Sequence, residues 1–169
     1  KKTGLLKGGY PNSLSISDLN NDGWPDIYIA NDFEVPDFLY LNNGNGSFTD
    51  VMENSMRHIS YFSMGVDAAD INNDGWQDLM VLDMVAEDNF RLKANMSGMD
   101  PKAFWEVVEN GGHYQYMYNA LQINVGNNSF SDIAQLAGVS STDWSWSPLF
   151  ADFDNDGHKD LFVSNGLKR

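Results

Sequence analysis

Short apolar runs alternate with polar turns along most of the chain. In its first part, four such runs follow one another at residues 14–16, 27–29, 38–41 and 48–51. Leu14 and Ile16 alternate with serines as in a half-buried β-strand, and an Asn/Gly cluster at 42–46 separates the last two runs as in a hairpin. Four short antiparallel strands in succession make up one blade of a β-propeller, so the pattern predicts a blade over residues 10–52.

The same order of runs recurs further along the chain, at residues 61–66, 79–82, 121–124 and 130–133. The spacing from Leu39 to Asp70 equals that from Leu121 to Asp152, so the additional residues of the second unit lie between its second and third strands. A third unit begins near Trp144 and has only two strands. We therefore predict an all-β fold of about two and a half propeller blades within one domain spanning 1–169: blade 10–52, blade 61–133 with an insertion at 85–114, and half blade 144–169.

The insertion has a helical character. Asp100 and Pro101 are typical of an N-cap and a first helical position, and Asn110 followed by two glycines is typical of a helix end. The sequence predicts one short helix here, with Phe104 and Trp105 on a shared face. An insertion within a blade projects from one end of a propeller, where binding sites are often found.

Propellers close with four to eight blades, and a sheet left open exposes unpaired strand edges. The chain also begins with Lys1 rather than Met and without a signal peptide, which is typical of a processed or excised piece. We therefore expect its partners to be other parts of a longer parent chain, or a second protein that completes the propeller.

A nine-residue polar turn precedes the second strand of each unit, at residues 18–26, 70–78 and 152–160. Each turn has oxygen-bearing side chains at positions one, three, five and nine, and glycine at position six. Ca²⁺ takes six to eight oxygen ligands, and glycine allows the sharp bend that brings alternate side chains to one centre. We predict three structural Ca²⁺ sites, with the carbonyl of position seven as main-chain ligand; the candidate residues are Asp18, Asn20, Asp22, Trp24, Asp26, Asp70, Asn72, Asp74, Trp76, Asp78, Asp152, Asp154, Asp156, His158 and Asp160.

The apolar residues at position twelve distinguish these turns from EF-hands, which require a glutamate there: the chain has Ile29, Val81 and Val163. A β-like run follows each turn directly, so the turn joins two strands. Without a cation, two carboxylates about 5 Å apart repel by roughly 3 kcal/mol at an effective dielectric constant near 20. Repetition of such a cluster at fixed spacing indicates a metal requirement.

The formal net charge is −14, and ten of the 24 acidic residues lie at the candidate ligand positions. This acidity argues against nucleic acids and anionic membranes as partners. The absence of cysteine excludes disulfides and thiolate metal sites. No apolar run reaches transmembrane length.

Segment 62–78, with its Phe62-x-x-Gly65 element ahead of the acidic turn, resembles the FG-GAP repeats of integrin α-subunit β-propellers and the related bacterial VCBS repeats. Hairpin 39–51 and segment 151–157 resemble bacterial members of the cartilage-acidic-protein and ASPIC/UnbV group. The resemblance implies a seven-bladed, calcium-binding propeller on a secreted or cell-surface protein, with the bacterial envelope and cell adhesion as the expected setting. At Asn20 and Asn72 the family commonly has Asp, so we expect weaker binding in those two turns.

The aromatic residues allow two interpretations. Trp144 lies at the position of Tyr10 and Phe62 in the other units, which favours packing. Trp146 is not dictated by the repeat and, with aromatic residues of the insertion, predicts either an exposed stacking surface or a cover over the blade; those residues are Trp105, Tyr114, Tyr116 and Tyr118. We expect Trp24 and Trp76 to shield their metal turns.

No catalytic constellation is evident. His58, His113 and His158 lack the spacing of a zinc site, and there is neither a Gly-x-Ser-x-Gly elbow nor a phosphate-binding glycine loop. The sequence favours a non-enzymatic module that binds or scaffolds proteins or glycans. Two alternatives stay open: a glycan-active enzyme with its site on the propeller face or insertion, and a subunit of a cell-envelope assembly whose partner closes the open edges.

Overall fold

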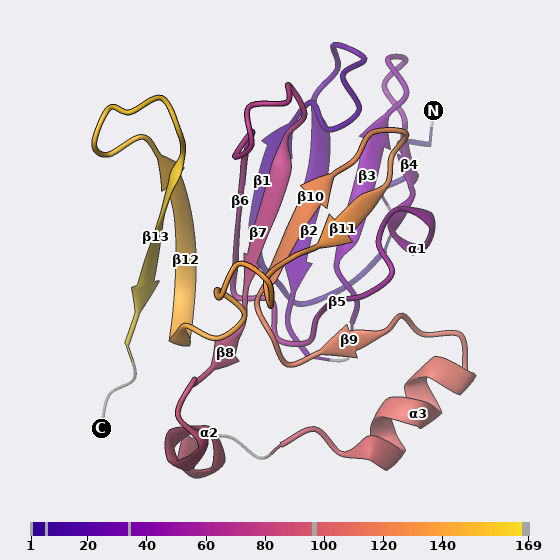
Figure 1. Cartoon of the computed structure of the whole chain (residues 1–169). Helices are drawn as coiled ribbons and strands as arrows, with labels where there is room; N and C mark the ends of the chain where they lie inside the picture. Colours follow the sequence, from indigo (N-terminus) through magenta and orange to yellow (C-terminus); the bar gives the residue numbers. More distant parts are fainter. Residues whose placement is uncertain (1, 6, 34, 96–97, 167–169) are drawn as a thin grey trace.

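A computed structural model describes residues 2–5, 7–33, 35–95 and 98–166. Positions 96–97 of the expected insertion and 167–169 of the expected half blade lie outside the described residues. Three antiparallel sheets stand next to one another, with the polar turns at one end and the longer helices at the other (Figure 1).

Sheet 1 has the strand order β1-β2-β3-β4, and sheet 2 has the order β6-β7-β10-β11. Sheet 1 consists of β1 (Pro11–Ser17), β2 (Asp26–Asn31), β3 (Phe38–Asn42) and β4 (Phe48–Asp50). Sheet 2 consists of β6 (Gly65–Ala69), β7 (Asp78–Leu82), β10 (Ala120–Asn124) and β11 (Phe130–Asp132). Two antiparallel four-stranded sheets confirm the predicted all-β, propeller-like fold class.

Sheet 3 pairs β12 (Asp143–Ala151) with β13 (Asp160–Asn165) on one side and with the short β8 (Met84–Val85) on the other. The described part of sheet 3 is thus a hairpin extended by a segment from the start of the expected insertion. The edge strand β6 of sheet 2 contacts both β1 of sheet 1 and β12 of sheet 3.

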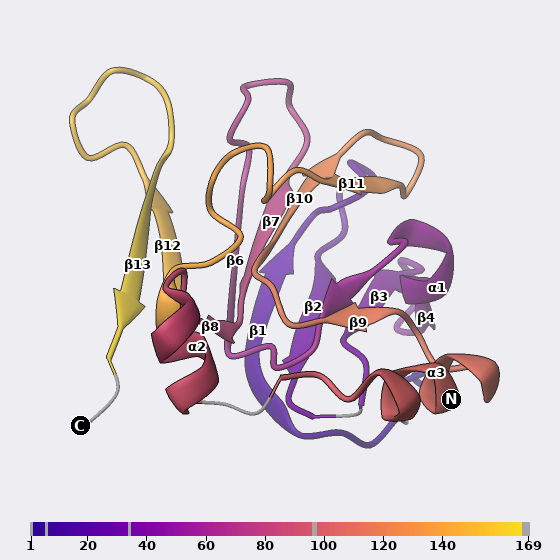
Figure 2. The same ribbon diagram turned by 60° about the horizontal axis from the view of Figure 1, so that its bottom comes forward.

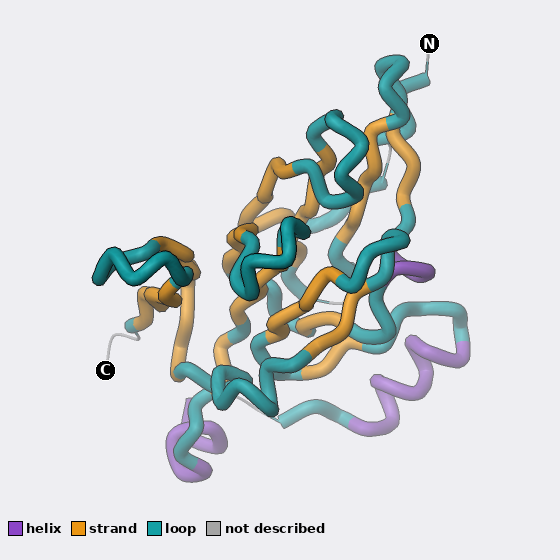
Figure 3. Tube along the Cα trace, turned by 45° about the horizontal axis from the view of Figure 1, so that its top comes forward, coloured by secondary structure: helices purple, strands orange, loops and turns teal. Residues whose placement is uncertain are grey.

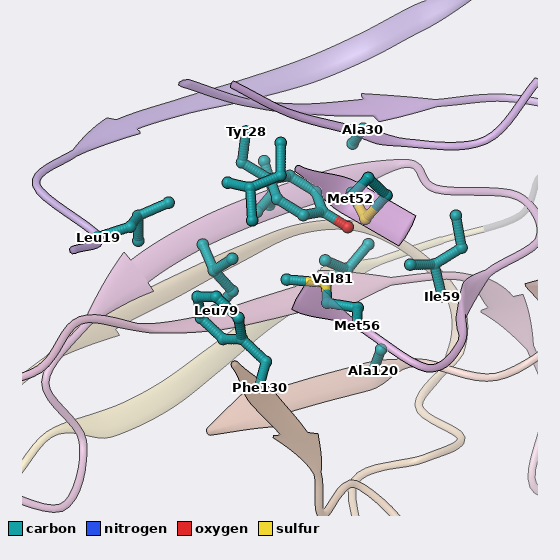
Figure 4. Close-up of a cluster of buried hydrophobic side chains, with 12 residues drawn as sticks. Leu19, Tyr28, Ala30, Met52, Met56, Ile59, Leu79, Val81, Ala120 and Phe130 are labelled. Atoms are coloured by element: carbon teal, nitrogen blue, oxygen red, sulfur yellow. The ribbon is translucent and has the colours of Figure 1, made fainter. Parts of the chain in front are cut away.

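The core lies between the faces of neighbouring sheets. All five residues of β7 are buried, because this strand contacts a sheet on each side. Leu79 and Val81 belong to one buried cluster with Tyr28 and Ala30 of sheet 1 (Figure 4), whereas Met80 and Leu82 pack toward sheet 3. The continuous apolar run of β7 therefore reflects burial on both faces.

The register repeats across the three polar turns. Ser17 pairs with Asp26, Ala69 with Asp78, and Ala151 with Asp160. Each turn therefore closes between the residue before position one and the aspartate at position nine, which places the same nine residues in the same relation to each sheet.

The insertion contains more structure than the sequence predicted. The predicted helix is present as α3 (Pro101–Glu109), and the Asp100 side chain accepts a hydrogen bond from the Lys102 N–H at 2.9 Å as its N-cap. A second helix, α2 (Asn89–Asn95), precedes it (Figure 2). The insertion returns through β9 (Gln115–Tyr116), which pairs in parallel with β5 (Ile59–Ser60). A single helical turn, α1 (Met52–Ser55), follows sheet 1 and buries Met52 in the core.

Candidate functional site

The three polar turns lie at the same end of the molecule, where loops join the first and second strands of each sheet (Figures 1 and 3). They have nearly identical internal hydrogen bonds. The carboxylate at position one accepts the backbone N–H groups of positions five and six; for Asp18 these distances are 3.1 and 2.8 Å. They are 3.0 and 2.8 Å for Asp70, and 3.0 and 3.0 Å for Asp152.

The carboxylate at position five accepts the N–H of position seven at 2.8 Å in all three turns, from Trp24 to Asp22, Trp76 to Asp74 and His158 to Asp156. Glycine at position six has a positive φ of 87–90° in every turn. Other residues rarely adopt this conformation, which accounts for the glycine.

The aspartate at position nine lies below the turn. Asp78 is fully buried and accepts the Ile71 N–H at 3.0 Å and the Asn124 N–H at 2.8 Å, so it ties its turn to strand β10. Asp26, at position nine of the first turn, accepts the Leu19 N–H at 2.9 Å and the Asn42 N–H at 2.8 Å. Asp160 accepts the Phe153 N–H at 2.9 Å.

Burial raises the pKa of the Asp26 and Asp78 carboxyl groups, and the acidic side chains at positions one and five of the same turn raise it further. In these two turns the neighbouring acidic side chains therefore disfavour the charged form of the position-nine carboxylate, which a cation would offset.

The donor set fits a hard divalent cation. In the third turn, carboxylate oxygens of Asp152, Asp154 and Asp156 all lie within 4.8 Å of one another. In all three turns, Oδ1 of the side chain at position three accepts the N–H of position five, at 3.1 Å for Asn20, 3.0 Å for Asn72 and 3.2 Å for Asp154. In the first two turns the asparagine also donates from Nδ2 to the position-five carboxylate at 2.9 Å. The third turn thus offers a cluster of carboxylate oxygens of the kind that Ca²⁺ prefers, whereas in the first two turns the asparagine amide nitrogen faces the position-five carboxylate.

The indole rings at position seven lie against the adjacent hairpins. A Cβ atom added at Gly44 would come within 2.8 Å of Trp24 Nε1, and one at Gly126 within 3.4 Å of the Trp76 ring. Gly44 and Gly126 hold the same place in the third-to-fourth strand turn of sheets 1 and 2. Each indole therefore links its polar turn to the neighbouring hairpin.

A profile of FG-GAP-like repeats matches residues 18–81 and 107–163, which is more than half of the chain and includes all three polar turns. The chain belongs to the FG-GAP-like repeat family. Integrin alpha-3 of Mus musculus is 32% identical to it over 90 residues, which cover 46% of this chain and 8% of the integrin. The chain thus spans less than a tenth of this curated relative. The residues between the two FG-GAP matches include α2 and the first part of α3.

In the part of the chain that the structure describes, no helix is long and apolar enough to cross a membrane. This agrees with the absence of a transmembrane run in the sequence.

The end of the sheets that carries the insertion, here called the insertion end, lies opposite the polar turns (Figure 1). It has a cavity of about 220 Å³ between α3 and the β5–β9 pair. Its lining is mainly apolar and includes Phe62, Met99, Phe104, Val107 and Met117. Neither Trp105, Tyr116 nor Trp146 is among the described residues that line it. Among the described residues that line the cavity, Asp100 carries a carboxylate, and that carboxylate caps α3.

Phe104, rather than Trp105, attaches the insertion to the blade. Its ring stacks on Tyr116 at 5.4 Å, while Trp105 is 54% exposed. Tyr114 and Tyr118 are also exposed. Trp146 lies at an irregularity in the register between β12 and β13, half exposed, and its Nε1 donates to the Gly166 carbonyl oxygen at 2.9 Å. The insertion both covers the blade and leaves aromatic rings at the surface.

Two buried carboxylates that sequence reasoning missed lie where sheets 1 and 2 meet. Asp37 accepts hydrogen bonds from the Tyr28 hydroxyl at 2.6 Å, the Asn31 N–H at 2.8 Å and the Ser63 hydroxyl at 2.9 Å. Burial, together with the charge of Asp83, raises the pKa of Asp37 to about 7.

Asp83 accepts from the Ser60 hydroxyl at 2.8 Å and from the backbone N–H groups of Tyr61 and Phe62 at 3.2 and 3.1 Å, and burial raises its pKa to about 7 as well. Segment 60–63 is thus held by both carboxylates. In the alignment of the two units, Asp37 corresponds to Asn119, and Asp83 corresponds to Asn31. A polar residue therefore recurs at each of these positions beside an apolar run, and this recurrence was a signal for them in the sequence.

We expect these two groups to make the chain more stable as the pH falls. Their pKa of about 7 in the folded state lies above the ordinary value of 3.8, so the folded state holds more protons between these limits. Their contribution is complete below about pH 4 and is lost as the pH rises toward 7. In the presence of a chelator, acidification from about pH 8 to about pH 5.5 should raise the free energy of unfolding by about 1–2 kcal/mol per group.

The variants Asp37→Asn and Asp83→Asn are matched tests, because asparagine occupies the equivalent positions of the other unit. Asn119 Oδ1 already accepts the Asp83 N–H at 2.7 Å, as Asp37 accepts that of Asn31. Urea denaturation at both pH values should show a smaller pH dependence in each variant than in the parent chain. An identical pH dependence in all three proteins would show that these carboxylates do not carry it.

Proposed function

We propose that this FG-GAP chain is a calcium-stabilised part of an extracellular or cell-surface β-propeller that binds or scaffolds proteins or glycans. The observation that carries the proposal is the repetition of one acidic turn, with the same hydrogen bonds and the same glycine conformation, at the same end of each sheet. A solvated turn does not require acidic side chains at one spacing in three copies.

The cation would be held by the side chains of positions one, three, five and nine and by the carbonyl of position seven. It would supply positive charge at the point where each turn gathers its carboxylates. The side chains at positions one and five also accept the backbone N–H groups of positions five to seven. Because calcium would bind the folded turn and not the unfolded chain, the free energy of unfolding would depend on the calcium concentration.

Further blades would cover the free faces of the outer sheets. Leu14 and Ile16 of sheet 1 are 58% and 61% exposed. The equivalents of Leu14 and Ile16 in sheet 2 are Val66 and Ala68, and both pack in the core that sheet 2 shares with sheet 1. We infer that a sheet of the same repeat type packs on Leu14 and Ile16, supplied by the parent chain or by a partner protein.

The setting is proposed from the similarity to integrin alpha-3 and from the expected resemblance of hairpin 39–51 to bacterial ASPIC/UnbV proteins. Calcium levels outside cells suit structural sites of modest affinity. We place the module on the outside of a cell, with the bacterial envelope as its setting. A protein or glycan partner would meet the exposed Trp105, Tyr114 and Tyr118 at the insertion end.

A calorimetric calcium titration tests this function. We expect three ions per chain, two of them bound more weakly, because Asn20 and Asn72 each replace a carboxylate that the third turn has in Asp154. Asn20→Asp and Asn72→Asp should each tighten one of the weaker sites by about tenfold, since charge count sets affinity in such sites. Absence of heat and of bound calcium would reject the proposal, and unchanged affinities in both variants would reject position three as a ligand.

A further inference from the structure

The side chain at position four of one polar turn contacts the next turn. Asn21 Nδ2 donates to the Gly75 carbonyl oxygen at 3.0 Å, which links the turn of sheet 1 to that of sheet 2. Asn73 Nδ2 donates to the Gly157 carbonyl oxygen at 3.3 Å and lies 3.2 Å from His158 Nδ1, which links sheet 2 to sheet 3. Two bonds of the same kind therefore connect three turns that are far apart in the sequence.

The backbone of position four makes this contact possible. Asn21, Asn73 and Asn155 have φ angles of 55°, 59° and 61°, in the left-handed region that asparagine tolerates better than most residues. Asparagine recurs at this position in all three turns, although its side chain contributes no oxygen to the proposed metal site of its own turn. The left-handed backbone accounts for asparagine in all three turns, and in the first two turns the amide also contacts the next turn.

Each of these bonds is accepted by a peptide group whose N–H also donates to a carboxylate of the next proposed metal site. The carbonyl of the Gly75–Trp76 peptide accepts from Asn21, and its N–H donates to the Asp74 carboxylate at 2.8 Å. In the Gly157–His158 peptide, the carbonyl accepts from Asn73, and the N–H donates to the Asp156 carboxylate at 2.8 Å. One peptide thus joins the amide of one turn to the position-five carboxylate of the following turn.

We propose that Asn21 and Asn73 couple the three turns, so that they bind calcium cooperatively. The inference rests on the proposed calcium function. A cation that orders one turn fixes the backbone of position four and with it the amide that holds the next turn. That turn then loses less conformational freedom on binding its own cation, and the effect is reciprocal.

Repulsion between cations in neighbouring turns acts against this coupling. The formal charge of the side chains at positions one, three, five and nine is −3 in the first two turns and −4 in the third. A bound divalent ion leaves each turn negative, so this repulsion is reduced. Salt at about 0.15 M screens charges more than roughly 8 Å apart and leaves hydrogen-bonded coupling largely intact.

Asn155 supplies the matched control. It has the same backbone conformation as Asn21 and Asn73, but among the residues that the structure describes its side chain has no hydrogen-bond partner. Substitution by glycine removes the amide and tolerates the positive φ, whereas alanine would add strain. Asn21→Gly, Asn73→Gly and Asn155→Gly therefore differ mainly in whether a bond between turns is lost.

Calcium titrations of the 169-residue chain by calorimetry at about 0.15 M salt test the proposal. The parent chain and Asn155→Gly should bind three ions with the same Hill coefficient, and this coefficient should exceed that of a variant without the two amides. The double variant Asn21→Gly/Asn73→Gly should still bind three ions, with a Hill coefficient of one or less and an average affinity about two- to tenfold lower, which is the range expected for loss of single hydrogen bonds.

Equal Hill coefficients in the parent and the double variant, with calcium still bound, would overturn the coupling and leave the proposed function standing. The same loss in Asn155→Gly would also overturn it, because the effect would then come from the turn itself. A parent chain that binds no calcium would overturn both.

Discussion

Chelation of calcium should lower the melting temperature of this FG-GAP chain by about 15–30 °C. At calcium levels one hundred times the dissociation constant, each site adds about 2.7 kcal/mol to the free energy of unfolding, so three sites add about 8 kcal/mol. For a domain of this size, 1 kcal/mol shifts the melting temperature by about 2–4 °C. Differential scanning calorimetry with and without EDTA measures the difference.

The control for this experiment is a variant without the position-five carboxylates, Asp22→Asn/Asp74→Asn/Asp156→Asn. Its melting temperature should respond little to EDTA, because the proposed sites have lost one charge each. Magnesium should replace calcium poorly, since it demands a smaller octahedral site. A parent chain whose melting temperature is the same in calcium and in EDTA would show that the turns are not stabilised by a cation.

Asp78→Ala should destabilise the calcium-loaded chain by about 3–5 kcal/mol. The Asp78 carboxylate is fully buried and accepts the N–H groups of Ile71 and Asn124. Alanine leaves both donors without a partner, at about 1–3 kcal/mol for each, and also removes a proposed cation ligand. Urea denaturation of both proteins in calcium measures the difference.

Asp160→Ala is the matched comparison, because Asp160 has the same position in its turn but is only partly buried and has the Phe153 N–H as its hydrogen-bond partner in the described part of the chain. We expect a loss of about 1–2 kcal/mol there. Equal losses in the two variants would mean that the bond to strand β10 contributes nothing and that the shared metal role determines both values.

The strands and polar turns were predictable from the sequence because their signals are local and repeated. The apolar run of β7 and the turn at 70–78 each recur at fixed spacing, so one copy supports the interpretation of the others. The same holds for α3, whose Asp100–Pro101 start is a local capping signal.

The features that sequence reasoning missed depend on contacts between distant segments. β9 exists because it pairs with β5, and β8 because it pairs with β12. The burial of Asp37 and Asp83 arises from the junction of two sheets, and the Asn21 contact from the placement of two turns side by side. Only the recurrence of polar residues at these positions was visible in the sequence.

Anomalous diffraction from crystals grown in calcium tests the central claim most directly. We predict three anomalous peaks, one in each of the turns 18–26, 70–78 and 152–160, each surrounded by oxygen atoms at about 2.3–2.6 Å. Turns that hold water alone at millimolar calcium would contradict it.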